Sequence, residues 1–122
     1  KGLMVENSAI YAPDQKPGID VFLSLIQLEK QGWAVIHEDN SGAHGNILGA
    51  QKFQAGSGSG IVELLRGTSE GVYYAMLHNE NGDGAFDHKK DLPLLGKDGT
   101  PILSKFNVSS KAEDPAETEV NL

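Results

Sequence analysis

The chain has 122 residues and a mass of 13.0 kDa, with 39% hydrophobic and 22% charged residues, which suits one globular domain. Ten basic residues against 17 acidic residues give a formal net charge of -7, which disfavours nucleic acid as a partner because phosphate backbones carry the same sign. No apolar run approaches the roughly 20 residues that cross a bilayer, so membrane insertion is not expected. The absence of cysteine excludes disulfides, thiolate metal sites and thiol catalysis.

Seven segments have the composition of short β-strands, because runs of apolar, β-branched and aromatic residues alternate with glycine, proline, asparagine and aspartate. The second run also fits helical spacing, with Val21 and Leu25 four positions apart and Asp20 able to cap a helix. The residues alone leave strand and helix open there. In chain order the runs are 3–12, 19–28, 33–39, 47–53, 61–65, 72–78 and 101–108.

Polar, glycine-rich segments separate these runs. Residues 40–45 and 79–99 are expected to be loops, and the Gly/Ser stretch of residues 55–60 is expected to be a mobile hairpin loop. Residues 109–122 are acidic and are expected to form a flexible tail after a domain of residues 1–108.

Seven short strands with turn signals between them predict an all-β fold, an antiparallel β-sandwich of about seven strands that is immunoglobulin/cupredoxin-like. Trp33 stands where the core tryptophan of the third strand is expected. Gly71 and Tyr73 resemble the Gly-x-Tyr corner of immunoglobulin domains, with Ala75 in place of the cysteine. A cross-strand aromatic cluster explains the tyrosine equally well.

Two stretches of the sequence read alike. Residues 32–40 and 71–81 each begin with glycine, continue through apolar and aromatic residues, and end in histidine, an acid two positions later, and asparagine. This is the pattern of a buried strand that runs into a polar loop. If the two strands lie side by side, we expect His37 and His78 to be neighbours and the two acidic loops to meet at one end of the fold.

His37, Met76 and His78 are therefore candidate copper ligands. Alternate residues of a strand share a face, so Met76 adds a thioether beside His78. Two imidazoles and a thioether suit a soft ion such as Cu(I), and the lack of cysteine excludes a blue-copper centre and leaves a carrier type of site. The alternative is that the histidines hydrogen-bond to loop carboxylates or to the backbone.

The segment of residues 79–91 holds candidate calcium ligands. Its side-chain oxygens occupy loop positions 1, 3, 5 and 9, with glycine at 6 and a backbone carbonyl at 7, which is the spacing of an EF-hand-like loop. Lys90 stands at position 12, where a bidentate acid normally closes the site, so Asp91 or Glu80 would have to replace it. The alternative is a polar loop shaped by glycines and Asx turns. The candidate ligands are Asn79, Asn81, Asp83, Asp87 and Asp91.

Five blocks of the sequence resemble one protein family. The blocks are Gly-Trp-Ala-Val-Ile-His (32–37), Gly-Asn-Ile-Leu-Gly (45–49), Tyr-Ala-Met-Leu-His (74–78), Gly-Ala-Phe-Asp (84–87) and Asp-Leu-Pro-Leu (91–94). They are similar to an uncharacterised family of extracytoplasmic β-sandwich domains in archaeal and bacterial surface or secreted proteins, sometimes found beside cupredoxin domains. The resemblance covers about residues 15 to 108, implies a strand at 19–28 and a location outside the cytoplasm, and supplies no activity. The chain departs from the family at Glu80, where aspartate is frequent.

The residues present no catalytic arrangement, so we expect no enzyme. The leading hypothesis is a non-catalytic extracytoplasmic module, secreted or on the cell surface, that acts in binding, adhesion or assembly through its loops and takes a protein or surface polymer as partner, with calcium as its candidate cofactor. The alternative is a small extracytoplasmic copper-binding carrier that uses His37, Met76 and His78.

Overall fold

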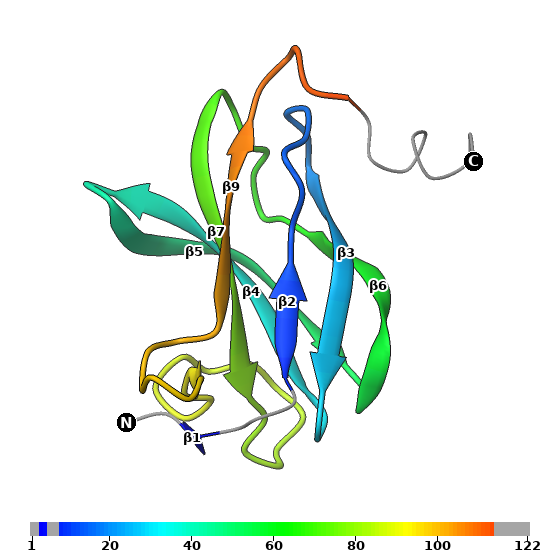
Figure 1. Cartoon of the computed structure of the whole chain (residues 1–122), viewed down its shortest axis with the longest axis vertical. Helices are drawn as coiled ribbons and strands as arrows, with labels where there is room; N and C mark the ends of the chain where they lie inside the picture. The colour runs from blue at the N-terminus through cyan, green and yellow to red at the C-terminus, as the bar shows by residue number, and fades with distance from the viewer. Residues whose placement is uncertain (1–2, 5–7, 114–122) are drawn as a thin grey trace.

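The computed structural model describes residues 3–4 and 8–113, in which seven strands form two facing antiparallel sheets and two short strands pair outside them (Figure 1). The β-sandwich expected from the sequence is confirmed. The smaller sheet has the order β2 (Ala9–Tyr11), β3 (Asp20–Leu28), β6 (Gly56–Glu63). The larger has the order β5 (Ala43–Phe53), β4 (Gly32–Asn40), β7 (Gly71–Asn79), β9 (Leu103–Val108). The short parallel pair is β1 (Leu3–Met4) with β8 (Leu94–Leu95).

The strand order follows the immunoglobulin plan. Lettered in chain order, strands A, B and E form the smaller sheet and strands C′, C, F and G form the larger one. The hydroxyl oxygen of Tyr73, at the start of β7, accepts a hydrogen bond of 3.0 Å from the backbone N–H of Ser69, four residues upstream. This is the kind of bond that defines a tyrosine corner. The ring centroids of Tyr73 and Phe106, on β9, are also 6.1 Å apart. Tyr73 therefore takes part both in a tyrosine corner and in a cross-strand aromatic contact.

The ambiguous segment of residues 19–28 is a strand. The pairing of β3 with β6 shifts register between Leu23 and Ile26, which marks a β-bulge. Val21 and Leu23 face the core before the bulge, and Ile26 and Leu28 face it after the bulge. The four-residue spacing of Val21 and Leu25 therefore does not mark a helix, because Leu25 lies within the bulge and is not part of the core cluster.

The expectation of a hairpin loop at residues 55–60 is wrong, because residues 56–60 belong to β6 and pair with β3 from Leu28↔Gly56 to Leu23↔Gly60. Backbone hydrogen bonds hold this strand, so a loop-like side-chain composition does not prevent it. A Cβ atom at Gly60 would lie 2.4 Å from Cε1 of Phe53, which explains why a glycine stands under that ring.

The loop expected at residues 40–45 is shorter than the sequence indicated. Ser41 and Gly42 form a tight turn with positive φ angles of 53° and 93°, and β5 begins at Ala43. Two residues with positive φ are typical of the type I′ turn, whose twist matches the strands of a hairpin. The first predicted strand, 3–12, is divided into β1 and β2, and residues 5–7 lie outside the described residues.

The core lies between the two sheets. From β4 it receives Ala34 and Ile36, and from β7 it receives Ala75 and Leu77, all of them without exposed surface. These residues alternate with neighbours that point to the other face of the larger sheet, as the pleat requires.

The outer face of the larger sheet is also buried over its central strands β4 and β7, and Trp33 lies there instead of in the core between the sheets. Trp33, Val35 and Met76 are 9%, 0% and 0% exposed, yet none belongs to the core cluster. Trp33 neighbours Ala34, which points into the core, so the pleat turns the indole outward. The indole N–H then donates a hydrogen bond to Glu80, which lies outside the sandwich, and buried indoles usually have such a partner. The expectation that Trp33 is the core tryptophan is therefore wrong.

The described residues contain no helix long and apolar enough to cross a membrane. Of the predicted tail, residues 114–122 lie outside the described residues. At its start the N–H of Ser109 donates to the carbonyl of Gln15, at 3.0 Å.

We predict that Gly49→Ala destabilises the domain while Gly58→Ala does not. A Cβ at Gly49 would lie 2.6 Å from the backbone oxygen of Glu63, whereas a Cβ at Gly58 meets nothing within 4 Å. Overpacking against backbone should lower the unfolding free energy by about 1–3 kcal/mol at Gly49, against less than about 0.5 kcal/mol at Gly58. Urea unfolding of both variants measures this, and equal midpoints would contradict the packing at Gly49.

Candidate metal centre on the outer face of the larger sheet

β4 and β7 are hydrogen-bonded partners, as the repeated sequence pattern predicted, but the register differs from the expectation. The strands run antiparallel, with Trp33 opposite His78 and His37 opposite Tyr74. The loops that follow His37 and His78 therefore lie at opposite ends of the strand pair, and the prediction that they meet at one end is wrong. Antiparallel neighbours always place equivalent ends of two strands apart.

His37 and His78 nevertheless meet on the outer face of the sheet. Their rings are stacked, with centroids 5.8 Å apart and an angle of 18° between the ring planes. Met76 faces the same side and pairs with Val35, so its register level lies between those of the two histidines. All three side chains are buried, at 4%, 4% and 0% exposure for His37, His78 and Met76. The three copper candidates are thus on one face of the sheet, two of them in direct contact.

A backbone carbonyl fixes the orientation of each imidazole. Nδ1 of His37 lies 2.9 Å from the carbonyl oxygen of Gly45, and Nδ1 of His78 lies 2.7 Å from that of Asp91. A carbonyl oxygen only accepts hydrogen bonds, so each Nδ1 carries the proton and donates. Each Nε2 is then left with a free lone pair.

The carbonyl that holds His37 is presented by an irregular stretch of β5. The pairing of β4 with β5 shifts on both sides of His37, from Ile36↔Gly49 to His37↔Ile47 and then to Asp39↔His44. β5 therefore takes five residue steps where β4 takes three. Bulges of this kind re-aim backbone and side chains, and here the carbonyl of Gly45 faces the imidazole across the strand.

The two Nε2 atoms have no hydrogen-bond partner although both are buried. In the described residues only one other buried side-chain nitrogen or oxygen, Oγ of Ser8, shares this condition. An unpaired buried polar atom costs about 1–3 kcal/mol, so two of them side by side require an explanation. A metal ion accepts imidazole lone pairs of this kind, and the Nδ1–H···O=C bonds are the usual outer contacts of metal-binding histidines.

Burial keeps both imidazoles neutral. Desolvation lowers the pKa of His37 from 6.5 to about 4, against the opposing effect of its bond to Gly45, and nearby His78 and His44 lower it further. Desolvation also lowers the pKa of His78, while its bond to Asp91 acts in the opposite direction. Both side chains are therefore neutral ligands at neutral pH.

The covering loop, residues 80–91, closes the His78 side of this face. The ring of Phe86 stands edge-on to those of His78 and Trp33, with centroids 5.5 Å from each. Glu80 accepts hydrogen bonds from Nε1 of Trp33 at 2.8 Å and from the N–H groups of Gly82 and Gly84 at 2.8 and 2.7 Å. The bonds from Gly84 and then Trp33 hold the pKa of Glu80 below its usual value. Glu80 thus anchors the loop over Trp33 as a carboxylate.

The calcium candidates are only partly brought together. Carboxylate oxygens of Glu80, Asp83 and Asp91 lie within 4.8 Å of one another, and this is the one group of three or more histidine or acidic donors that the described residues contain. Asp87 is outside it, and its Oδ1 accepts from the N–H of Lys89. Asp91, which is fully buried, accepts from the N–H of Asn81 and of Asp87. The loop's own amides therefore engage these oxygens, and the bond from Lys89 to Asp87 is an Asx turn of the kind that the alternative expected. Calcium binding stays a prediction.

Sequence reasoning missed one neighbour of the centre, His44. Its ring lies 5.0 Å from that of His37, at an angle of 76°. The sequence predicts a loop at residues 40–45, which gives His44 no position relative to the sheet. Only the tight turn at Ser41 and the bulges of β5 place it beside His37.

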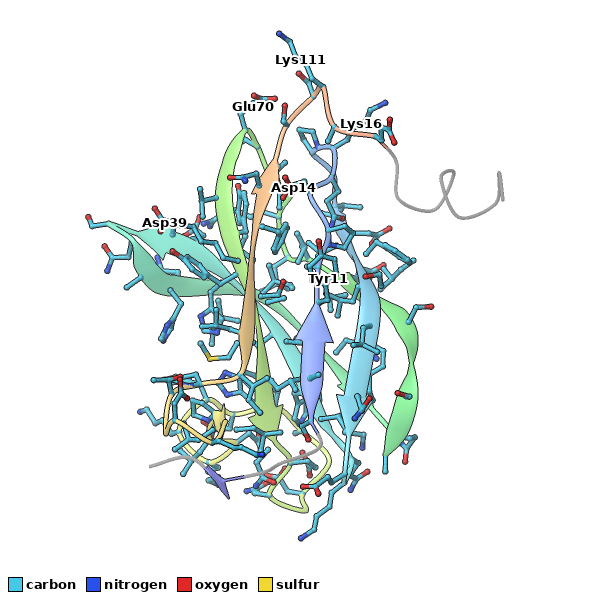
Figure 2. All side chains as sticks on the ribbon, viewed as in Figure 1. Tyr11, Asp14, Lys16, Asp39, Glu70 and Lys111 are labelled. Atoms are coloured by element: carbon cyan, nitrogen blue, oxygen red, sulfur yellow. The ribbon has the colours of Figure 1, made fainter. Side chains whose placement is uncertain are left out.

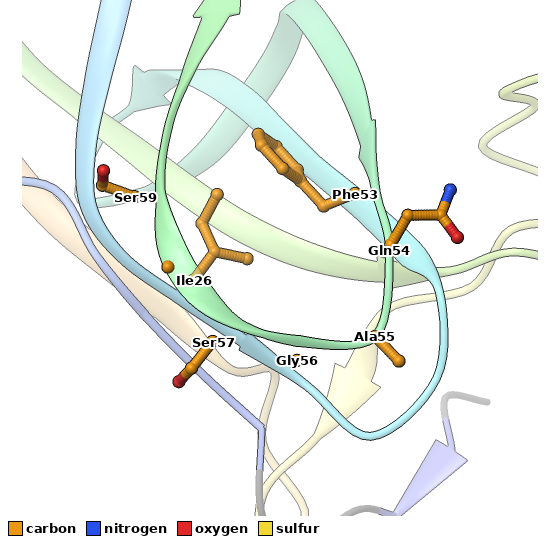
Figure 3. Close-up of a pocket in the computed structure, with 8 residues that line it drawn as sticks. Ile26, Phe53, Gln54, Ala55, Gly56, Ser57 and Ser59 are labelled. Atoms are coloured by element: carbon orange, nitrogen blue, oxygen red, sulfur yellow. The ribbon is translucent and has the colours of Figure 1, made fainter.

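A groove of another kind lies elsewhere on the domain. It has a volume of about 230 Å³ and lies at the corner between β5 and β6 (Figure 3). Ile26 and Phe53 supply its large apolar side chains, and residues 54–59 supply the rest. None of these lining residues is titratable, so the groove offers no metal ligand of the histidine or carboxylate type and no acid–base group.

The fold and this centre define a β-sandwich domain with a covered outer face. Residues 8–109 match the family model of a domain of unknown function, DUF7282, and the chain belongs to that family. The match begins just before β2 and ends just after β9, so it spans the whole sandwich. No curated protein and no solved structure matches the chain. Membership agrees with the resemblance to an uncharacterised family seen in the sequence.

We predict that acid weakens the fold through the buried histidines. The unfolded chain binds protons near pH 6.5 and folded His37 only near pH 4, so this stabilisation is complete above pH 6.5 and is lost as the pH falls toward 4. Each such histidine contributes a slope of up to about 1.4 kcal/mol per pH unit. His37→Asn keeps an N–H for Gly45 and should flatten the profile in urea unfolding. If the pH dependence of stability were the same in this variant as in the wild type, buried His37 would not be a source of the acid sensitivity.

We predict that Glu80→Gln loosens the covering loop without unfolding the sandwich. One carboxylate oxygen becomes an NH₂ group, so either Trp33 or the amides of Gly82 and Gly84 lose their acceptor. In either orientation the neutral amide oxygen is a weaker acceptor than the carboxylate. Hydrogen exchange at Gly82 and Gly84 should therefore accelerate, while the amides of β4 keep their protection. The matched control is Asp83→Asn at an exposed position of the same loop. Equal exchange in both variants would show that Glu80 does not anchor the loop.

Proposed function

We propose that this domain is a non-catalytic module that binds a soft monovalent metal ion, Cu(I), between His37, His78 and Met76. The observation that carries the proposal is the pair of buried Nε2 lone pairs without hydrogen-bond partners on two stacked rings. Each ring is already oriented through Nδ1, which is how proteins prepare imidazoles for a metal.

The donor set favours Cu(I) over divalent ions. Imidazole and thioether are the ligands that soft Cu(I) accepts, and all three donors here are neutral. A divalent ion would bring a second positive charge into a buried site, and burying charge is costly. Among the described residues, no group of three histidine or carboxylate donors within 4.8 Å of one another includes a histidine, so the tetrahedral His/carboxylate sets typical of Zn²⁺ have no counterpart at this centre.

The non-catalytic role rests on the closure of the site. The Nε2 atoms are buried, and Phe86 and Trp33 pack beside His78, so a substrate molecule has no room next to the metal ligands. A domain of this kind would store or carry the ion.

An extracytoplasmic location is part of the proposal. Outside the cytoplasm thiols are oxidised to disulfides, and a site built from histidine and methionine keeps its donors there without cysteine. The family resemblance found in the sequence points the same way. Adhesion or assembly through the loops, and calcium binding by the segment of residues 79–91, remain separate predictions.

We predict that the domain binds one Cu(I) ion per chain in anaerobic competition with the chromophoric chelator bicinchoninate. His37→Asn and His78→Asn each retain an N–H for the backbone carbonyl but lack Nε2, so each should weaken binding by about 10–100-fold or more. Met76→Leu keeps the volume of the side chain and should weaken binding less. His88→Gln, at an exposed position of the covering loop, is the control.

Thermal unfolding of the same samples distinguishes loss of the site from loss of the fold. Cu(I) bound only by the folded state must raise the melting temperature of the wild type. Affinity in a folded His37→Asn/His78→Asn double variant equal to that of the wild type would refute the proposal.

A further inference from the structure

The proposed site poses a problem of access. The Nε2 atoms of His37 and His78 are buried, and on the His78 side the rings of Phe86 and Trp33 pack over the centre. An ion bound to a chelator or a donor protein cannot contact these atoms directly. A ligand at the surface must therefore take the ion first.

His44 has the required position. It is exposed, and its ring stands edge-on to the ring of His37 with centroids 5.0 Å apart. The β4–β5 hairpin that carries it projects from the body of the sandwich, with Asp39 on its opposite strand (Figures 1 and 2). His44 thus presents one imidazole to solvent and to the buried site together.

Distance argues that His44 is not a permanent third ligand. The nitrogens of His37, His44 and His78 do not form a group within 4.8 Å of one another, because the one such group in the described residues is Glu80, Asp83 and Asp91. An ion held between His37 and His78 is therefore not held by His44 in the same arrangement. His44 is close enough for an ion to pass between the two rings.

We propose that His44 is the exchange ligand through which the metal ion enters and leaves the His37–Met76–His78 site, an inference that rests on the function proposed above. A nitrogen of His44 displaces one ligand of the donor complex, and Nε2 of His37 then displaces His44 as the ion moves inward. Each step forms one metal–ligand bond and breaks another, and the ion stays Cu(I) throughout, so no oxidant or reductant is needed. Release follows the same steps in reverse.

The bulged part of β5 supports this role. The two register shifts beside His37 place the carbonyl of Gly45 against the imidazole and bring His44, the residue before Gly45, to the edge of that ring. One local irregularity therefore orients the buried ligand and positions the exposed one.

The test is the rate of Cu(I) transfer between bicinchoninate and the intact domain, followed by the absorbance of the chelator complex in a stopped-flow instrument without oxygen. His44→Gln lies at an exposed hairpin position, where surface substitutions change stability little. We expect it to slow both loading and removal by at least about tenfold, because losing the intermediate ligand raises the barrier to both. The equilibrium affinity should stay at the wild-type value.

His88→Gln is the matched control, because His88 is exposed on the covering loop, on the side of His78. Loading of His44→Gln at the wild-type rate would overturn the inference and leave Cu(I) binding intact. Slow transfer in His88→Gln alone would also overturn the inference, because the ion would then enter on the His78 side, at the covering loop. An equilibrium loss in His44→Gln as large as that in His37→Asn would make His44 a permanent ligand and overturn its exchange role. Absence of Cu(I) binding by the wild type would refute the proposed function itself.

Discussion

The antiparallel pairing of β4 with β7 is the constraint on which the site depends. Its register puts Trp33 opposite His78 and His37 opposite Tyr74, and so decides which side chains point into the sandwich and which point away from it. Gly32 is part of this constraint, since a Cβ there would lie 2.8 Å from the backbone oxygen of His78. The close approach of the two strands at Gly32 therefore fixes the backbone position of His78.

On the outer face of the larger sheet, β4 and β7 bury polar side chains, among them His37 and His78. This is unusual, because the second face of an antiparallel sheet is commonly exposed to solvent. The covering loop makes this burial tolerable by satisfying most of the polar atoms there. Glu80 accepts from the indole of Trp33, and the backbone of Asp91 accepts from His78. What the loop leaves unsatisfied are the two Nε2 atoms, and they are the atoms on which the proposed function rests.

Sequence patterns predicted the sandwich, the pairing of its two central strands and the meeting of His37 with His78. They failed where backbone geometry outweighs composition. Gly60 and its neighbours look like a linker, yet glycine there makes room for Phe53 and the backbone pairs with β3. Trp33 looks like a core residue, yet the pleat turns it outward. His44 could not be placed at all, because two bulges in β5 move it beside His37 and bulges leave no reliable mark in a single sequence.

The bonds from each Nδ1 to a backbone carbonyl have a thermodynamic consequence. Because both rings are anchored and stacked as the chain folds, their rotational freedom is lost during folding and not when an ion arrives. Association with such a rigid receptor carries little further penalty in side-chain entropy. At the proposed site, selectivity would then follow from shape, since a rigid pair of imidazoles cannot rearrange around an ion that demands a different coordination geometry.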